Sequence, residues 1–564
     1  MKITGSQAVL QSLIEEGAKY IFGYPGGAIM PVYDAMMQYE DKIQHILTRH
    51  EQGAIHAAQG YARVTGDVGV CMATSGPGAT NLITGVADAM IDSTPLVCIT
   101  GQVGSPLLGT DAFQETDVVG ISMPVTKWNY LITKSEEIPW VMAKAFYIAR
   151  TGRPGPVLID IAKDAQFGEL EYNYEKCNHI RSYQPKPKID ESQIAEAAKL
   201  INGAKKPYIL FGQGIMLGSA EEEFKTFVEK SGIPAAWTIL GAPALDTNHP
   251  LNMGMLGMHG NYSPNILTND CDVLIAIGMR FDDRVTGDLS RYAKQAKVVH
   301  LELDIAELNK IVKADAPVLG DVKDTLPLLT ELVEKKDYSD WIAKFKELDK
   351  IEDEKVIQPE MYPTKEGMTM AEVVRILNEK TKDDAIFVTD VGQHQMFASR
   401  YCKRHTTRCF VTSGGLGTMG FGLPAAFGAK VGAPEKEVIL IVGDGGLQMT
   451  IQEFGTIMQE DVAVKIVLLN NKFLGMVRQW QQLFFDKRYS NTPMVNPDFI
   501  KVADGYGIAG KKVLDRPNLK GAVEEMLNHK GPYLLEVSIE KEDNVFPMVA
   551  TGASVSEVIL EAAK

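Results

Sequence analysis

Residues 437–471 constrain the fold most, because they predict two buried strands joined by a helix. Apolar runs at 438–442 and 464–469 have the length and composition of strands buried on both faces. The segment between them, at 450–458, places its apolar residues on one face of a helix. A strand–helix–strand unit of this kind brings its two strands together in parallel. We therefore expect an α/β fold.

Polar residues follow both strands of this unit. Asp444 lies within Gly443-Asp444-Gly445-Gly446 after the first strand, and Asn471 follows the second. Because the carboxyl ends of parallel strands share one edge, where ligands of open α/β sheets bind, we expect these two side chains to lie close together. A carboxylate and an amide oxygen suit Mg²⁺, and the glycines let a diphosphate approach the backbone. The unit predicts a metal–diphosphate site, although a Gly-Asp-Gly triplet alone is usually only a turn.

Length, charge and cysteine content limit what the chain can be. At 564 residues it exceeds a single core, so we expect about three domains. A formal net charge of −15 argues against a nucleic-acid partner, which needs a basic surface. Six scattered cysteines without a CxxC pair favour reduced thiols and disfavour zinc. The N-terminus reads as an amphipathic helix, and no apolar run reaches membrane-spanning length, so we expect a cytoplasmic protein.

Strand and linker patterns divide the chain into three α/β units. We expect the first over residues 1–180, the second over 189–338 and the third over 365–545, followed by a tail over 546–564. The proline-spaced segment 181–188 reads as a linker, and a charged segment at 335–365, with a surface helix over 341–351, marks the next boundary. The first and third units look alike in architecture, but the sequence shows no repeat.

Three segments resemble a known superfamily. They are GDG at 443–445 with NN at 470–471, the segment 49–63 around Glu51, and ATSGPGATN at 73–81. Together they resemble the metal motif and pyrimidine domain of thiamine-diphosphate-dependent enzymes. In nearly all members one glutamate bonds N1′ of the aminopyrimidine and so assists loss of the thiazolium C2 proton. The resemblance assigns this role to Glu51, which alone would read as a glutamate favoured at a helix N-terminus.

Further motifs narrow the resemblance to the biosynthetic, FAD-containing acetohydroxyacid synthases (acetolactate synthases), catalytic large subunit. The matching segments, in chain order, are residues 23–28, 49–63, 74–81, 112–115, 152–156, 163–164, 255–260, 280–287, 412–420, 443–471 and 474–481. The family implies three doubly wound parallel-sheet domains: an N-terminal pyrimidine domain, a central Rossmann-like FAD domain and a C-terminal diphosphate domain. The resemblance covers nearly the whole chain.

The resemblance also implies which residues contact thiamine diphosphate. Most stand at glycine-rich turns of the two outer units: Gly27, Pro77, Asn81, Val391, Gly392, Gln393, His394, Gly417, Met419, Gly443, Gly445, Gly446, Gly475 and Met476. Mg²⁺ is assigned to Asp444, Asn471 and the backbone carbonyl of Phe473. The catalytic set is Glu51, Phe113, Gln114, Lys163, Met419 and Trp480. In that set Met419 props the cofactor into its bent form, and Trp480 helps recognise the second 2-keto acid.

The central unit distinguishes the FAD-containing acetohydroxyacid synthases from other thiamine-diphosphate-dependent enzymes. Gly212-Gln213-Gly214 after a strand is by itself a weak dinucleotide signal, because it lacks the full GxGxxG spacing. The resemblance implies FAD contacts at Arg153, Gly212, Gln213, Gly214, Thr238, Met258, His259, Gly278, Arg280, Asp282, Arg284, Val285, Glu302 and Asp321. Arginines suit a pyrophosphate, and Glu302 at a strand end suits a ribose hydroxyl. The flavin of this family has no net redox role, and the catabolic acetolactate synthases lack it.

The reaction implied is the decarboxylation of pyruvate on thiamine diphosphate. The hydroxyethyl unit is then joined to a second pyruvate, giving 2-acetolactate, or to 2-oxobutyrate, giving 2-aceto-2-hydroxybutyrate. These are the first shared products of branched-chain amino acid biosynthesis (valine, leucine and isoleucine). The family places thiamine between two subunits, so we expect a homodimer or tetramer, and a regulatory small subunit is a candidate partner.

Three alternatives stay open. Pyruvate oxidase and glyoxylate carboligase also combine thiamine with flavin, but the carboligase lacks the activating glutamate that Glu51 supplies here. A catalytically silent scaffold or regulatory subunit would not need intact Glu51, Asp444 and Asn471. Two departures from the family pattern bear on substrate preference more than on reaction class. They are Ala162 in place of proline before Lys163, and GDGGLQM in place of the commoner GDG-S/A-F form.

Overall fold

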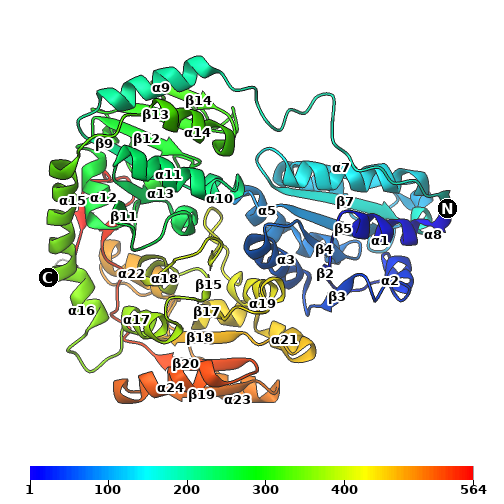
Figure 1. Ribbon diagram of the computed structural model, residues 1–564. Coiled ribbons are helices and arrows are strands. Elements are labelled where there is room, and N and C mark those ends of the chain that lie inside the picture. Colours follow the sequence, from blue (N-terminus) through cyan, green and yellow to red (C-terminus); the bar gives the residue numbers. More distant parts are fainter. Residues whose placement is uncertain (563–564) are drawn as a thin grey trace.

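The computed structural model describes residues 1–562, in which three six-stranded parallel sheets follow one another along the chain. Figure 1 shows these sheets surrounded by helices, with the N-terminal domain in blue and cyan, the central domain in green, and the C-terminal domain in yellow to red. This is the α/β class that the apolar runs predict. The central strands carry those runs because both of their faces are covered by helices.

The N-terminal sheet has the order β3-β2-β4-β5-β7-β6. Its strands are β2 (Tyr20–Gly23), β3 (Gln44–Leu47), β4 (Gly69–Ala73), β5 (Leu96–Gln102), β6 (Trp128–Ile132) and β7 (Pro156–Ala162). Its main helices are α1 (Gly5–Glu15), α2 (Met30–Met36), α3 (Glu51–Thr65), α4 (Pro77–Asn81), α5 (Ile83–Ile91), α7 (Ile138–Arg150) and α8 (Lys163–Phe167). The expected N-terminal helix begins only at Gly5, because β1 (Lys2–Thr4) pairs with β8 (Glu169–Glu171).

The central sheet has the order β11-β10-β9-β12-β13-β14. Its strands are β9 (Pro207–Phe211), β10 (Ala235–Trp237), β11 (Asn252–Met255), β12 (Val273–Ile277), β13 (Lys297–Glu302) and β14 (Ala316–Leu319). Its main helices are α9 (Glu191–Gly203), α10 (Gly214–Leu217), α11 (Glu221–Ser231), α12 (Tyr262–Thr268), α13 (Asp283–Thr286) and α14 (Val322–Leu332). Counted along the chain this order is 3-2-1-4-5-6, the order of dinucleotide-binding sheets, which bind their ligand where the order reverses. Here the order reverses between β9 and β12.

The C-terminal sheet has the order β16-β15-β17-β18-β20-β19. Its strands are β15 (Ile386–Thr389), β16 (Phe410–Val411), β17 (Val438–Gly443), β18 (Lys465–Asn470), β19 (Ala509–Val513) and β20 (Tyr533–Ser538). Its main helices are α17 (Met370–Thr381), α18 (Gln393–Tyr401), α19 (Gly422–Gly432), α22 (Gly475–Phe484), α23 (Phe499–Gly505) and α24 (Arg516–Asn528). Counted along the chain, this sheet and the N-terminal sheet share the order 2-1-3-4-6-5, a repeat that the sequence does not reveal.

The crossover between β17 and β18 differs from the single helix expected over 450–458. It consists of α20 (Asp444–Met449), the 3₁₀ turn η7 (Ile451–Glu453) and α21 (Phe454–Glu460). The break falls at Thr450, whose φ of −136° is not helical and whose hydroxyl donates to the carbonyl of Gly420 at 3.1 Å. At the other end of the crossover, helical structure begins at Asp444, directly after β17. The glycine-rich residues 444–446 therefore form the first turn of a helix.

The helix expected over 341–351 is α15 (Ser339–Glu352), which links the central and C-terminal domains. One face of α15 lies at the surface, as expected, and the other face is buried. Trp341 and Phe345 are buried in the core of the central domain, and the indole of Trp341 donates to the carbonyl of Pro207 at 2.9 Å. The connection between the central and C-terminal domains is therefore packed against the central domain.

The N-terminal and C-terminal domains meet through α3 and α19. A Cβ built on Gly60 of α3 would lie 2.0 Å from the carbonyl oxygen of Ala425, and one built on Gly428 of α19 would lie 2.0 Å from that of Ala57. Each helix therefore places a glycine against the backbone of the other, and the contact is reciprocal. Only glycine allows so close an approach.

The end of the chain returns to the central domain. β21 (Met548–Val549) pairs with β22 (Val558–Ile559), and the amide of Val549 donates to the carbonyl of Met258 at 2.8 Å. The tail predicted over 546–564 therefore packs beside the central sheet, although its last two residues lie outside the described part of the chain. Among residues 1–562, no helix combines the length and apolar character needed to cross a membrane.

Candidate active site

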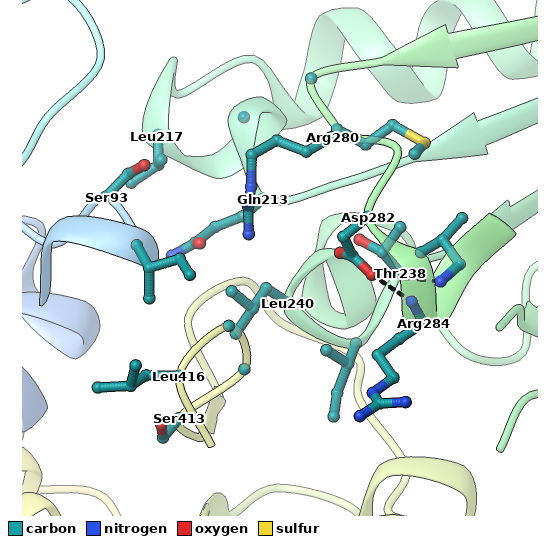
Figure 2. Close-up of a pocket in the computed structure, with 18 of the residues that line it drawn as sticks. Ser93, Gln213, Leu217, Thr238, Leu240, Arg280, Asp282, Arg284, Ser413 and Leu416 are labelled. Carbon is teal, nitrogen blue, oxygen red and sulfur yellow. Dashed lines mark hydrogen bonds between the residues drawn. The ribbon is translucent and has the colours of Figure 1, made fainter. Parts of the chain in front are cut away.

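A cavity of about 1130 Å³ lies where the three domains meet. The central domain contributes its strand ends around the reversal point, the N-terminal domain contributes residues after α5, and the C-terminal domain contributes residues after β15 and β16. Figure 2 shows Gln213, Arg280 and Asp282 from the central domain facing Leu416 and Ser413 of the C-terminal domain across this space. The cavity has the size and interdomain position of a cofactor site.

Glycines open the cavity at the reversal point of the central sheet. Gly214 follows β9 and Gly278 follows β12, and a Cβ built on either would come within 3 Å of the other residue's Cα. Gly278 also has a φ of +56°, which favours glycine. The two glycines thus let the ends of β9 and β12 pack against each other, and because both residues also line the cavity, their backbone is exposed to a ligand there.

Charged side chains are arranged around this edge. Asp282 caps α13 by accepting from the amides of Arg284 at 2.9 Å and Val285 at 3.2 Å, and Figure 2 shows the first of these contacts. The Nε of Arg153 donates to the hydroxyl of Ser93 at 2.9 Å. Burial raises the pKa of the Glu302 carboxyl to about 7. The edge thus offers cationic groups for an anion and a carboxyl suited to a hydroxyl donor.

Most of the residues assigned to FAD lie in this cavity. Of that set, those lining it are Arg153, Gln213, Gly214, Thr238, Met258, His259, Gly278, Arg280, Asp282, Arg284, Val285, Glu302 and Asp321. Gly212 is the exception. It packs beneath the edge, where an added Cβ would lie 2.5 Å from the carbonyl oxygen of Gly278. Sequence reasoning missed Ser93, Leu240 and Leu416, which reach the cavity from other elements and carry no local signal.

The C-terminal domain brings the predicted metal ligands to one edge. Asp444 follows β17 and Asn471 follows β18, which are paired neighbours in the sheet. Burial raises the pKa of the Asp444 carboxyl to about 6. The side-chain amide of Asn496 donates a hydrogen bond to this carboxylate at 2.6 Å, and this bond acts in the opposite direction on the pKa. The Asn471 oxygen accepts from the Phe473 amide at 3.1 Å. This Asn496 contact was not predicted, because the two residues lie far apart in sequence.

The diphosphate-binding candidates gather around these two residues. The Asn471 amide donates to Gln393 at 3.3 Å, and a Cβ on Gly475 would lie 2.1 Å from the same Gln393 oxygen. His394 is buried, its pKa is lowered to about 4 by burial, and its Nε2 has no hydrogen-bond partner within residues 1–562. A neutral imidazole with a free nitrogen can bond a ligand oxygen.

The cavity continues into this half of the molecule. Its C-terminal wall includes Val391, Gly392, Gly417, Met419, Met476 and Trp480. Beneath them, Asp390 accepts from the amides of Gly420 at 3.0 Å and Gly422 at 2.8 Å, although sequence reasoning did not single it out. The other C-terminal candidates lie outside the cavity lining: Gln393, His394, Gly443, Asp444, Gly445, Gly446, Asn471, Phe473 and Gly475.

The N-terminal candidates form a separate group at the carboxyl edge of their own sheet. Glu51 is the first residue of α3, and it accepts from the side-chain amide of Asn81 at 2.9 Å. The turn at Gly76 packs against Gln114, whose φ of +59° is unusual for a residue with a side chain. The side chain of Phe113 is 89% exposed.

The same group includes Gly27, which is exposed after β2, Pro77 at the start of α4, and half-buried Lys163 at the start of α8. None of Gly27, Glu51, Pro77, Asn81, Phe113, Gln114 and Lys163 lines the cavity in the described chain. We call these N-terminal candidates and the group around Asp444 and Asn471 the two half-sites; within residues 1–562 neither Glu51 nor Asp444 and Asn471 line the cavity.

Comparisons with known proteins agree with this division into three domains. Models of thiamine pyrophosphate enzymes match the chain in order: the N-terminal TPP binding domain over residues 3–121, the central domain over 194–329 and the C-terminal TPP binding domain over 390–537. The acetolactate synthase large subunit of Lactococcus lactis is 46% identical over 559 residues, which cover 99% of this chain and 96% of the relative. The chain belongs to the acetolactate synthase large-subunit family.

Other members of the acetolactate synthase family match equally far. The isozyme 2 large subunit of Escherichia coli is 45% identical, with 99% of both chains covered. The probable large subunit of Methanocaldococcus jannaschii is 45% identical over 98% of this chain and 95% of its own length. The family and the fold class predicted from sequence motifs are therefore confirmed, and the outer domains are thiamine pyrophosphate (thiamine diphosphate) binding domains.

Proposed function

We propose that this chain is the catalytic subunit of an acetolactate synthase. It decarboxylates pyruvate and joins the two-carbon unit to a second pyruvate or to 2-oxobutyrate, at the start of branched-chain amino acid biosynthesis. The observation that carries the proposal is the single cavity that joins the reversal point of the central sheet to Met419, Met476 and Trp480. That continuity suits a flavin-bearing thiamine enzyme, because the flavin pocket and the thiamine-side wall open into one space.

FAD fits the central part of the cavity. Gly214 and Gly278 both line the cavity and carry no side chain that would keep a pyrophosphate from the backbone, and Arg280 points into the space beside Gln213 in Figure 2. His259 is buried with its Nδ1 lacking a partner among residues 1–562, so it can bond a ligand atom. We assign Arg153, with its neighbour Ser93, to the same cofactor. The flavin has a structural role in the proposed reaction.

Thiamine diphosphate and Mg²⁺ fit the carboxyl edge of the C-terminal sheet. Asp444, Asn471 and the carbonyl of Phe473 supply the oxygen ligands that Mg²⁺ prefers. No group of three or more His, Cys, Asp or Glu that could hold a metal occurs within residues 1–562, so a mixed ligand set is required. Thiamine supplies the electron sink for carbon dioxide loss. The protein holds the diphosphate, and the half-buried side chains of Met419 and Trp480, which line the cavity, shape the space beside it.

We assign Glu51 to cofactor activation in a homodimer. In that homodimer the second copy supplies Glu51 and Phe113, which do not line the cavity of their own chain. Apolar side chains stand exposed on both half-sites, including Phe113 at 89% and Met449 at 53%. A second copy that covers these groups would exclude water from the reaction. Phe113, Gln114 and Lys163 then form the substrate end.

The domain boundaries follow the same assignment: residues 1–180 bind the pyrimidine, 189–338 bind FAD and 365–545 bind the diphosphate and Mg²⁺. Because its relatives are named large subunits, we also propose that this chain binds a regulatory small subunit.

The proposed activity is tested by incubating the purified protein with pyruvate, thiamine diphosphate, Mg²⁺ and FAD and assaying acetolactate. Product formation without net flavin reduction is expected. Lasting bleaching of the flavin on anaerobic addition of pyruvate would instead identify a pyruvate oxidase, and absence of acetolactate would refute the proposal.

A further inference from the structure

The N-terminal end of α3 is held by a carboxylate from the C-terminal domain of the same chain. Glu453, in η7, is fully buried. Its two oxygens accept from the backbone amide of Arg49 at 3.2 and 3.1 Å, and the Thr456 hydroxyl donates to it at 2.6 Å. Amides at the start of a helix lack partners within the helix, and a carboxylate there is favoured by the helix dipole. Arg49 lies one residue before the N-cap residue His50, so Glu453 fixes the connection that leads into α3 and places its carboxylate near the positive end of the helix.

The space for this carboxylate exists only because residue 53 is glycine. A Cβ built on Gly53 would lie 2.3 Å from Oε1 of Glu453 and 2.6 Å from its Cδ. The carboxylate thus spans the first turn of α3, from the amide of Arg49 to the surface of Gly53. Residues 51 and 53 point about 200° apart around a helix, so Glu453 lies on the face opposite the side chain of Glu51. Contact between the two carboxylates is thereby avoided.

Arg49 strengthens the same attachment. Its guanidinium donates to the carbonyls of Leu47 and Gly455 and to the side chain of Gln459, each at 2.9 Å. The short connection between β3 and α3 is therefore fixed on both sides to the segment η7–α21. Two residues beyond Arg49, Glu51 begins α3 and accepts from Asn81. Glu51 has little freedom of its own, because the backbone on which it stands is bonded to a second domain.

We propose that Glu453 is a positioning residue for Glu51, and that Gly53 serves the same function by leaving room for it. The inference rests on the proposed role of Glu51. Glu453 acts through the backbone at the start of α3 and touches neither substrate nor cofactor. The segment that begins with the metal-ligand candidate Asp444 thus ends, at Glu453, against the helix that presents the activating glutamate.

The test measures cofactor activation apart from turnover. Purified variants are loaded with thiamine diphosphate and Mg²⁺ without substrate, and exchange of the thiazolium C2 proton with D₂O is followed by acid quench and NMR. Glu453→Gln keeps the shape but replaces one of the two oxygens that accept from the Arg49 amide with an NH₂ group. We expect its C2 exchange rate to fall about tenfold, as a small misplacement of a catalytic group would cause. Its affinity for thiamine diphosphate, by titration, should stay within about twofold of wild type.

Gly53→Ala perturbs the same contact without changing Glu453, so it keeps the test valid if Glu453→Gln fails to fold. Alanine normally stabilises a helix by about 1 kcal/mol relative to glycine. Here it displaces the carboxylate, and we expect the same loss of C2 exchange. Gly521→Ala in α24 is the matched control, because an added Cβ there meets no atom within 4 Å. That control should exchange at the wild-type rate.

Glu51→Gln separates this inference from the function on which it rests. If Glu51→Gln slows exchange while Glu453→Gln and Gly53→Ala exchange like wild type, the positioning role is wrong and the proposed function stands. Unaltered exchange in Glu51→Gln would overturn both. Equal losses of exchange, cofactor affinity and thermal midpoint in Glu453→Gln and Gly53→Ala would show a general structural role and would also overturn the inference.

Discussion

In both outer domains the second strand leads into the helix at the domain interface: β3 into α3, and β16 into α19. The sheets share one strand order, and the two helices meet through reciprocal glycines. The strand ends carry different chemistry. The third and fourth strands of the C-terminal sheet end at Asp444 and Asn471, whereas β4 and β5 end at Thr74 and Val103. Under the proposed assignment, the same topology holds a metal site in one domain and an activating carboxylate in the other, as expected when function is carried by sites and not by folds.

The largest effect should come from the N-terminal half-site. Glu51→Gln keeps the shape and the contact with Asn81 but removes the carboxylate, so turnover should fall by about 10²–10⁴-fold while cofactor affinity is kept. Initial rates of acetolactate formation measure this loss. Glu354→Gln, at an exposed position, is the control. Normal turnover in Glu51→Gln would mean that the two domains do not divide the chemistry in this way.

A substitution beside the proposed metal site should affect the C-terminal domain alone. Asn496 donates to Asp444 at 2.6 Å and to Asn470 at 3.1 Å, so Asn496→Ala removes the group that orients the carboxylate proposed to bind the metal. We expect Mg²⁺ affinity to weaken by about 10–100-fold. The Mg²⁺ concentration for half-maximal activity reports this change, with exposed Asn528→Ala as the control. A half-maximal concentration equal to wild type would argue against the metal assignment.

The reciprocal helix contact predicts equal effects in the two domains. Gly60→Ala and Gly428→Ala each place a Cβ about 2.0 Å from a carbonyl oxygen of the other helix. Overpacking of this kind costs roughly 1–3 kcal/mol and outweighs the helix propensity gained, so both variants should lower the thermal midpoint by similar amounts. Calorimetry measures the shifts. A variant that is more stable than wild type would show that this contact is looser in solution.

A smaller, pH-dependent difference should arise at the end of the first strand of each sheet. β15 is followed by buried Asp390, whereas β2 is followed by exposed Tyr24. Burial raises the pKa of Asp390 to about 6, so the folded state keeps its proton while the unfolded carboxyl ionises near pH 4. The stability from this group is therefore present below about pH 4 and is lost as pH rises toward about 6, at no more than about 1.4 kcal/mol per pH unit.

Asp390→Asn removes this titration. Thermal midpoints of the cofactor-free protein between pH 4 and 7 should therefore fall less steeply with rising pH in the variant than in wild type. Identical slopes would assign the pH dependence to other buried carboxyls, and Asp390 would then be ionised in the folded state.

The sequence revealed the two central strands of the C-terminal sheet better than the edge strands of the N-terminal sheet. The runs at 438–442 and 464–469 correspond to β17 and β18, which are buried along almost their whole length. The edge strands β3 and β6 were not predicted, because their side chains are half-exposed and form no continuous apolar run. The break at Thr450 also escaped prediction, since it depends on a bond to Gly420 in another segment.

The site was predictable where it follows known motifs and hidden where it depends on contacts between distant segments. Glu51, Asp444 and the arginine-rich stretch at 280–287 stand in recognisable local patterns. Ser93, Asn496 and Glu453 do not, because each acts on a residue more than 50 positions away in sequence. Nor does any local pattern reveal that Glu51 lies outside the cavity lined by Met419, which is a property of the folded chain.

The proposed sharing of each site between two copies of the chain has a consequence for mixtures of inactive proteins. Pure preparations of the Glu51→Gln variant and of the Asp444→Asn variant should each have almost no acetolactate-forming activity. In a mixed pair that exchanges half-sites, one site receives both defects and the other receives neither. Unfolding and refolding the two inactive preparations together should therefore restore activity, at a level set by the fraction of mixed pairs.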